Sequence, residues 1–151
     1  MNLEQKIMAE LKTAMLAKDE KNVRSLRAIK AAIIIAKTAE GAKGEISESD
    51  ELKLLQKMVK QRKDSLEIFQ QQNRKELADI EQEEISIIER FLPQQLTQEQ
   101  IRQQIETIIA QSGANSPAEM GKVMGIANKQ LSGQADGKTI SAIVKELLSK
   151  K

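Results

Sequence analysis

Two stretches in the middle of the chain carry hydrophobic residues at alternating spacings of three and four. The first consists of Leu52, Leu55, Val59, Arg62, Leu66 and Phe69, and the second of Leu77, Ile80, Glu84, Ile87 and Phe91. Such spacings predict two helices with heptad-like seams. Asn73 lies between them, and asparagine is one of the few residues besides glycine that tolerate the left-handed conformation in which helices end. The pattern predicts a long helical hairpin that turns at Asn73.

Arg62 and Glu84 are the only charged members of the two seams. In an antiparallel hairpin centred on Asn73, facing residues have numbers that sum to about twice 73, which pairs Arg62 with Glu84 and Phe69 with Leu77. Glu84 could instead act as a general base or bind a substrate amine. We favour a structural ion pair, because a buried charge needs a partner and a polar pair can fix the register of packed helices.

The region before the hairpin is predicted to form two further helices. They run over about 3–17 and 20–39 and begin after the capping residues Asn2 and Asp19. The hairpin's own first helix is expected to begin after Ser47.

Pro93 is the first proline of the chain and marks the predicted domain boundary. Helix can follow helix through residues 1–92 because no proline interrupts them. We therefore expect an all-α protein, with an N-terminal helical bundle over 1–92 that contains the long hairpin. A small C-terminal three-helix domain is expected over 93–151.

Cap signals in the C-terminal region are denser. Ser116, Pro117 and Glu119 supply an N-cap, an N1 proline and an N3 carboxylate in sequence, which is a strong helix start. Together with caps at Thr97 and Asp136, they predict helices over about 98–112, 117–132 and 137–149.

Composition excludes several kinds of chemistry. The chain has no Cys and no His, so disulfides, zinc fingers, thiol nucleophiles and histidine acid–base catalysis are excluded. We expect no metal, no cofactor and no catalytic residue. The start, MNLEQKIMAELK, predicts an amphipathic helix rather than a signal peptide, and the longest apolar run is too short to span a membrane. A cytosolic protein without membrane contact is expected.

Two glycines four residues apart, Gly121 and Gly125, interrupt a segment with a helical pattern. Glycine inside a helix costs about 1 kcal/mol relative to alanine. Both lie outside the apolar arc of that helix, on the side that carries Lys122 and Lys129. Either the glycines allow close packing against a neighbouring helix, or they form a docking surface for a phosphate backbone or a partner helix. The spacing alone leaves both explanations open.

Several stretches resemble the YqeY-like family (GatB/YqeY) of small bacterial proteins. They are AKDEKNVRSLRAIKAAI, LQKMVKQRKDSLEIF, ERFLPQQLT, MGKVMG and ADGKTISAIVKELL. The resemblance spans essentially the whole chain, and FLPQQL and MGKVMG are its most specific parts. The sequence departs from the family pattern in IIIAKT at 33–38, which is less polar, and at Asn73, where the family often has glycine.

The resemblance implies a two-part helical protein related to the tail domain of the tRNA-dependent amidotransferase B subunit. In that enzyme the tail helps to hold tRNA, while other domains perform the amide chemistry. Carried over to this chain, the matching positions are Gly121, Lys122, Gly125 and Lys138. Residues 93–151 carry seven Lys and Arg against five Asp and Glu and no aromatic ring. Any RNA contact should therefore be to backbone and shape, modest and salt-sensitive.

Three functions remain as hypotheses. The first is a non-catalytic module that binds tRNA or a tRNA-handling enzyme, with Lys129 completing its surface. The second is a protein–protein adaptor that accepts a partner helix on the glycine-bearing side. The third is an amidotransferase-type enzyme (a carbon–nitrogen ligase with glutamine as amido-N donor), for which the sequence offers no nucleophile. The oligomeric state stays open.

Overall fold

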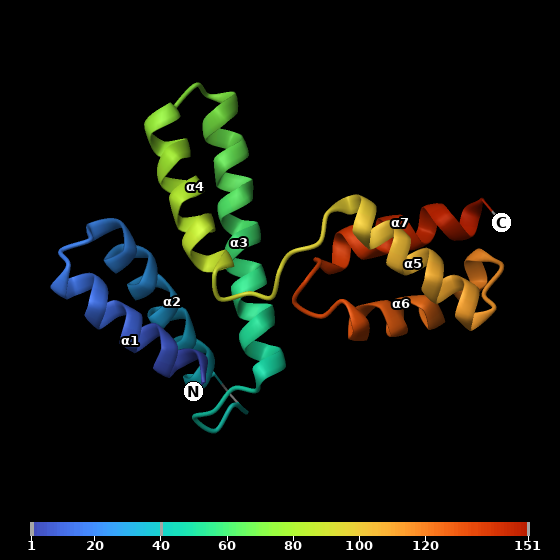
Figure 1. Cartoon of the computed structure of the whole chain (residues 1–151), viewed down its shortest axis with the longest axis horizontal. Coiled ribbons are helices and arrows are strands. Elements are labelled where there is room, and N and C mark those ends of the chain that lie inside the picture. The colour runs from blue at the N-terminus through green and yellow to red at the C-terminus, as the bar shows by residue number, and fades with distance from the viewer. Residues whose placement is uncertain (1, 40, 151) are drawn as a thin grey trace. The chain divides into compact units, whose positions relative to one another are not determined.

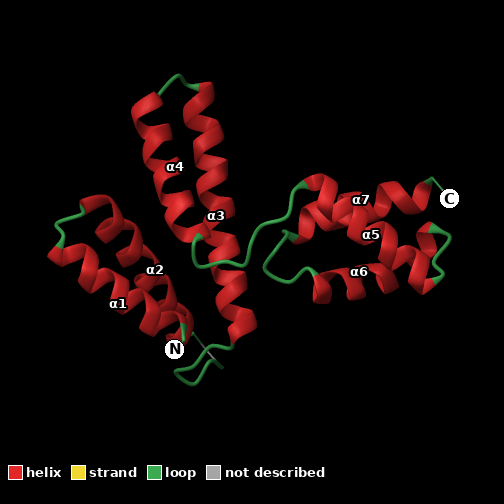
Figure 2. Cartoon of the chain, viewed as in Figure 1, coloured by secondary structure: helices red, strands yellow, loops and turns green. Residues whose placement is uncertain are grey.

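The computed structural model describes residues 2–39 and 41–150 of the chain. Within those residues the secondary structure is helical and contains no strand, so the predicted all-α fold is confirmed (Figures 1 and 2). The elements are α1 (Leu3–Leu16), α2 (Glu20–Thr38), α3 (Glu48–Gln71), α4 (Lys75–Glu89), α5 (Gln98–Ser112), the 3₁₀ helix η1 (Pro117–Glu119), α6 (Met120–Gln130) and α7 (Gly137–Ser149). No helix among the described residues is long and apolar enough to cross a membrane.

The chain forms two compact units, Met1–Leu92 and Pro93–Lys151. Each unit has its own hydrophobic core. Phe91 and Leu92 pack against the first core, whereas Leu96 packs against the second. The division therefore falls where the side chains change from one core to the other.

The N-terminal unit consists of two helical hairpins, α1–α2 and α3–α4, and α2 contacts both helices of the second hairpin. Aliphatic side chains from all four helices fill its core; the fully buried ones include Ile7, Leu26, Ile29, Ile33, Leu55 and Ile88. Asn73 has φ 57°, the left-handed conformation that the sequence predicts for the turn between α3 and α4. The backbone N–H of Arg74 donates to the Phe69 carbonyl at 2.9 Å and closes the end of α3.

The helix starts follow their capping residues. The side chain of Asn2 accepts from the backbone N–H of Gln5, whose own side chain accepts from the N–H of Asn2. Asp19 caps α2 through the N–H of Asn22, and its hydrogen bonds with Asn22 hold the pKa of the Asp19 carboxyl below its usual value. Ser47 caps α3 in the same way. Local side-chain chemistry therefore decides where these helices begin.

The structure brings Arg62 and Glu84 together at the centre of the α3–α4 hairpin. The Arg62 Nε lies 2.9 Å from the Glu84 Oε2, and the two side chains are only 18% and 13% exposed. A guanidinium nitrogen of Arg62 also donates to the Met58 carbonyl at 3.3 Å. The pair thus occupies the facing positions that the seams predict.

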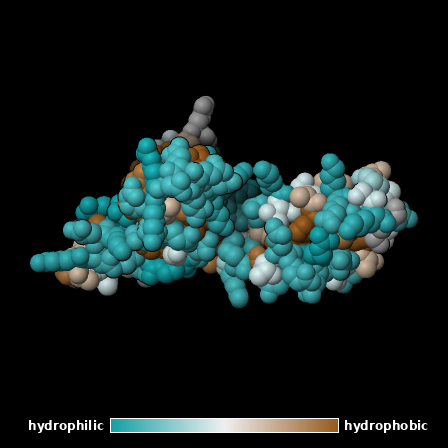
Figure 3. Space-filling model, turned by 90° about the horizontal axis from the view of Figure 1, so that it is seen from above, coloured by the Kyte–Doolittle hydropathy of each residue, from teal (hydrophilic) through white to brown (hydrophobic). Residues whose placement is uncertain are grey.

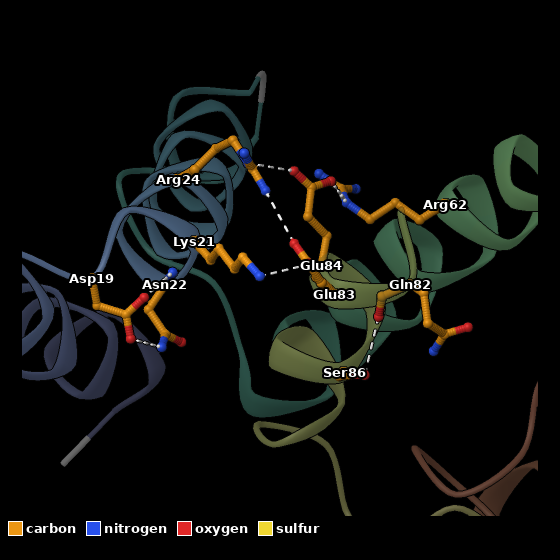
Figure 4. A network of polar contacts seen from close by, with 9 residues as sticks. All are labelled: Asp19, Lys21, Asn22, Arg24, Arg62, Gln82, Glu83, Glu84 and Ser86. Carbon is orange, nitrogen blue, oxygen red and sulfur yellow. Dashed lines mark hydrogen bonds and ion pairs between the residues drawn. The ribbon is translucent and has the colours of Figure 1, made fainter. Parts of the chain in front are cut away.

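Glu84 has a second cationic partner that the seams do not indicate. The Nε of Arg24, on α2, lies 3.3 Å from the Glu84 Oε1. Figure 4 shows Arg24 and Arg62 on either side of this carboxylate. Lys21, also on α2, contacts the neighbouring Glu83 at 2.9 Å. The two carboxylates of α4 therefore link α2, α3 and α4.

The pKa of Glu81, on α4 shortly before these carboxylates, is affected by its charged neighbours. Its pKa is raised, first by burial and then by the negative charge of Glu84, while Arg62 acts in the opposite direction.

The C-terminal unit packs α5, α6 and α7 around a separate aliphatic core. Its most buried side chains are Ile105, Ile109, Val123, Ala127, Leu131, Ile140, Val144 and Leu148. The segment before α5 is bound to the loop between α6 and α7. The Leu96 N–H donates to the Gln134 carbonyl at 3.0 Å, and the Gln95 side chain donates to the Gly133 carbonyl at 2.7 Å. These bonds hold the start of the unit against the loop that precedes α7.

Replacing Arg62 with Leu should destabilise the N-terminal unit, but by less than if Arg62 were the only partner of Glu84. Breaking a buried pair typically costs about 3–5 kcal/mol. Because Arg24 remains beside Glu84, we expect about 1.5–3 kcal/mol, the range for a hydrogen bond to a charged group. The cost should rise in an Arg24→Ala background, and Arg62→Leu/Glu84→Leu should recover much of it. Urea unfolding of the full chain measures each difference.

The adjacent residue offers a matched control. Lys63 contacts Glu89 at 3.8 Å but is 60% exposed, so Lys63→Leu should change the free energy of unfolding by less than about 1 kcal/mol. Equal effects of the two Leu substitutions would contradict a register-fixing role for Arg62.

Candidate functional site

Helix α6 has two chemically distinct sides. Val123, Ala127 and Leu131, which follows the helix directly, are completely buried in the C-terminal core. The opposite side is exposed and includes Gly121, Lys122, Gly125 and Lys129. We call these four residues the glycine face. Packing of the aliphatic side fixes the rotation of the helix, so the glycine face is turned outward.

The space around the two glycines distinguishes between their predicted roles. A Cβ atom built at Gly121 or at Gly125 would meet nothing within 4 Å. Among the described residues of the C-terminal unit, no helix therefore packs closely against either glycine. The hypothesis that the two glycines allow close packing against a neighbouring helix is therefore wrong. Nothing in the packing of the unit's described residues explains why these two positions are glycine.

The start of α6 differs from the predicted one. Ser116 makes no capping hydrogen bond, and Pro117–Glu119 form a 3₁₀ turn before the α-helix begins at Met120. The Glu119 carboxylate instead accepts a hydrogen bond from the backbone N–H of Asn115 at 2.6 Å. This carboxylate therefore orders the turn before the helix rather than capping its first turn.

Lys122 has a structural contact. Its ammonium group donates to the carbonyl of Ser112, the last residue of α5, at 3.1 Å. A cation at a helix C-terminus is favourable, because the last carbonyls are unsatisfied and carry partial negative charge. Gly113 follows with φ 74° and ends the helix. Part of the role of Lys122 is therefore to join α6 to α5.

Lys129 stands in the last turn of α6 and is exposed. Among the described residues, no hydrogen bond or ion pair involves its ammonium group. The sequence of α6, MGKVMGIANKQ, contains no acidic residue. The glycine face thus combines uncovered backbone with positive charge.

Lys138 lies in a different part of the unit. It is in the first turn of α7 and lines a depression of about 450 Å³ between α5 and α7, together with Glu99, Arg102 and Glu146. The structure therefore brings Gly121, Lys122, Gly125 and Lys129 together on one helix and places Lys138 apart from them.

An ion pair crosses the α5–α7 depression. Arg102 donates to the Glu146 carboxylate at 2.8 Å, and Lys150 contacts its other oxygen at 3.0 Å. The hydrogen bond from Arg102 is the main reason why the pKa of Glu146 lies below its usual value, and the same bond raises the pKa of Arg102. Sequence patterns did not predict this pair, because its members lie on different helices and share no periodicity.

The acidic side chains of the described residues are not gathered into a metal site, and several of them are held in ion pairs. No group of three or more acidic residues is placed to hold a metal ion within residues 2–39 and 41–150. Glu83 and Glu84 of the N-terminal hairpin are occupied by Arg24, Arg62 and Lys21. What the glycine face can do is admit another molecule close to the helix backbone and neutralise negative charge on it.

The sequence model of the YqeY-like proteins matches residues 4–148, nearly the whole chain. The chain belongs to the YqeY-like family. Two further matches are to proteins called "Altered inheritance of mitochondria protein 41, mitochondrial". The chain is 41% identical over 86 residues to the one from Clavispora lusitaniae, covering 57% of this chain and 49% of that protein.

The second of these relatives comes from Meyerozyma guilliermondii. It is 35% identical over 130 residues, a match that covers 80% of this chain and 64% of that protein. The chain thus spans less than two thirds of the length of either relative. Both relatives are fungal and carry a mitochondrial name, so the description of the YqeY-like family as small bacterial proteins is too narrow.

The open space at the glycine face predicts how Ala substitutions there change the stability of this YqeY-like chain. Replacing Gly121 and Gly125 with Ala should stabilise the protein by about 0.5–1 kcal/mol per substitution, because alanine restricts the unfolded chain and favours the helix. The open space leaves no clash to offset this gain. Urea unfolding of the double variant measures it.

Gly113 supplies the control in the same unit. Its φ of 74° is unfavourable for a residue with a Cβ, so Gly113→Ala should destabilise by about 1–2 kcal/mol. Destabilisation by Gly121→Ala/Gly125→Ala would show that these glycines are needed by the fold after all.

Proposed function

We propose that this YqeY-like chain is a non-catalytic helical module whose C-terminal unit binds tRNA through the glycine face. The observation that carries the proposal is the open backbone at Gly121 and Gly125, with exposed lysines at 122 and 129 on the same side of α6. Two exposed glycines reduce the stability of a helix, and no other described residue of the unit fills the space that they leave.

The geometry favours contact with a sugar–phosphate backbone. Without Cβ atoms at two positions one turn apart, a phosphate group can approach α6 more closely than at any alanine. Lys129 is free to meet its charge, and the ammonium group of Lys122 lies beside the end of α5. Both aromatic residues, Phe69 and Phe91, precede the C-terminal unit, so base stacking is no part of the contact. Recognition would be of shape and backbone, as is usual for helical RNA.

The resemblance of the sequence to the amidotransferase tail domain supplies the class of nucleic acid. The names of the two relatives mention neither RNA nor amide transfer. They do mention mitochondria, whereas the N-terminal sequence predicts the cytosol. The proposal holds for either compartment, because both contain tRNA.

A protein–protein adaptor is the second candidate, and one observation favours it. Glycines four residues apart on an exposed helix side also let the backbone of a partner helix approach closely. Such a partner would need negative charge near Lys129. An amidotransferase activity of the chain itself is a third candidate, which measurable glutamine hydrolysis by the purified protein would support.

Titration of the full chain against labelled tRNA, between about 50 and 200 mM salt, tests the proposal. Lys129→Gln should weaken binding and reduce the slope of log affinity against log salt by about one. Gly121→Ala/Gly125→Ala should weaken binding by about tenfold or more, equivalent to 1.4 kcal/mol, although the same variant is expected to fold more stably. Loss of binding could not then be attributed to unfolding.

Lys145→Gln is the matched control, because Lys145 is exposed on α7 and lies outside the glycine face. It should leave the affinity nearly unchanged. Binding that is indifferent to both Lys129 and the glycines would contradict the proposal. A complex with a protein that survives nuclease treatment and requires Gly121 and Gly125 would favour the adaptor instead.

A further inference from the structure

The outer side of the α1–α2 hairpin carries an uncovered apolar groove. It has a volume of about 260 Å³ and is lined by Met8, Leu11, Lys12, Met15, Leu16 and Lys30. We call it the α1–α2 groove. It belongs to the N-terminal unit and shares no residue with the glycine face, so a role for the groove is independent of the tRNA proposal.

The groove exposes large apolar side chains. Met8 and Met15 are 49% and 50% exposed, and Leu16 is 78% exposed. Ile34, one turn after Lys30 on α2, is 47% exposed. Figure 3 shows one face of the molecule, which is mostly hydrophilic with scattered hydrophobic patches. Exposed apolar residues that line a common depression mark interaction sites. Methionine side chains adapt readily to different partners, which suits such a site.

Two lysines give the groove its charge. Lys12 and Lys30 lie on opposite helices, and neither forms an ion pair or a hydrogen bond through its ammonium group within the described residues. No acidic side chain lines the groove. A partner would therefore need an apolar surface for the floor and negative charge at its edges.

We propose that the α1–α2 groove binds an acidic amphipathic α-helix of a partner protein. The groove follows α1 from Met8 to Leu16, a length of about 12 Å at 1.5 Å per residue, so it can contact about two turns of a partner helix. Apolar residues of that helix at spacings of three and four would contact Met8, Met15 and Leu16. Carboxylates beside them would meet Lys12 and Lys30.

Other occupants fit the groove less well. Sites for small molecules are concave and usually hold about 300–1,000 Å³, more than this shallow groove offers. Recruitment to anionic membranes typically takes clusters of about 4–8 basic residues, whereas the groove has two lysines. Its concave, apolar floor suits inserted side chains better than a lipid surface.

The test uses the full chain and a designed probe. The probe is a labelled helical peptide of about four turns, with Leu at spacings of three and four and Glu on the flanking positions. A matched peptide carries Lys in place of Glu. Fluorescence anisotropy should show that the wild-type chain binds the Glu peptide at least about tenfold more tightly than the Lys peptide.

Variants of the chain locate the site. Met15→Glu/Leu16→Glu should weaken binding of the Glu peptide by about tenfold or more, the effect of losing about 1.4 kcal/mol. Ile35→Glu is the control, because Ile35 is 70% exposed on the same hairpin but does not line the groove, and it should have little effect. Lys12→Glu/Lys30→Glu should reverse the preference toward the Lys peptide. Circular dichroism of each variant checks that the helices are retained.

Several results would overturn the proposal. They are equal binding of the two peptides, no binding of either, or binding that Met15→Glu/Leu16→Glu leaves intact. Binding to vesicles of phosphatidylserine and phosphatidylcholine without binding to the Glu peptide would assign the groove to a membrane surface. Self-association in analytical ultracentrifugation that Leu16→Glu abolishes would assign it to a second copy of the chain.

Discussion

The carboxylate of Glu84 is the contact on which the arrangement of the N-terminal unit depends. One of its oxygens meets Arg62 of the same hairpin, and the other meets Arg24 of α2. The Glu84 side chain is only 13% exposed, and burying a carboxylate without such partners is strongly unfavourable. Because Arg62 comes from α3 and Arg24 from α2, their contacts with Glu84 favour an arrangement in which α2, α3 and α4 meet at this carboxylate.

That placement decides which side of α2 stays open. Lys21 and Arg24 face α4, where Glu83 and Glu84 bind them. Lys30 follows Arg24 by six residues and therefore projects about 120° away around the helix. It lies beside α1, at the edge of the α1–α2 groove. The ion pairs between α2 and α4 and the exposed apolar groove are thus two consequences of one rotation of α2.

Features that depend on neighbouring residues were predictable from the sequence, and features that depend on tertiary contacts were not. The turn at Asn73, the caps at Asn2 and Asp19 and the facing of Arg62 with Glu84 follow from local chemistry and periodicity. The approach of Arg24 to Glu84, the bond from Lys122 to the α5 carbonyl and the Arg102–Glu146 pair required the fold. The predicted helix start at Ser116 and Pro117 was wrong, because this segment forms the 3₁₀ helix η1. The Glu119 carboxylate accepts a hydrogen bond from Asn115, four residues before it, instead of capping a helix. For the candidate site, periodicity identified the exposed side of α6 but could not say whether a neighbour covers it.

The open space at Gly121 and Gly125 limits the possible reasons why these two positions are glycine. A glycine in a helix needs either a close neighbour or a positive φ to justify its destabilising effect, and here the fold supplies neither. Alanine at both positions would make a better helix and an equally good core. This open space is what supports our proposal that the exposed side of α6 meets a molecule outside the unit. Because α6 carries lysines and no carboxylate, that molecule should bring negative charge close to the helix backbone. A sugar–phosphate backbone carries this negative charge along its whole length. A partner helix would need acidic residues near the lysines and would also have to align its own backbone along the two glycines.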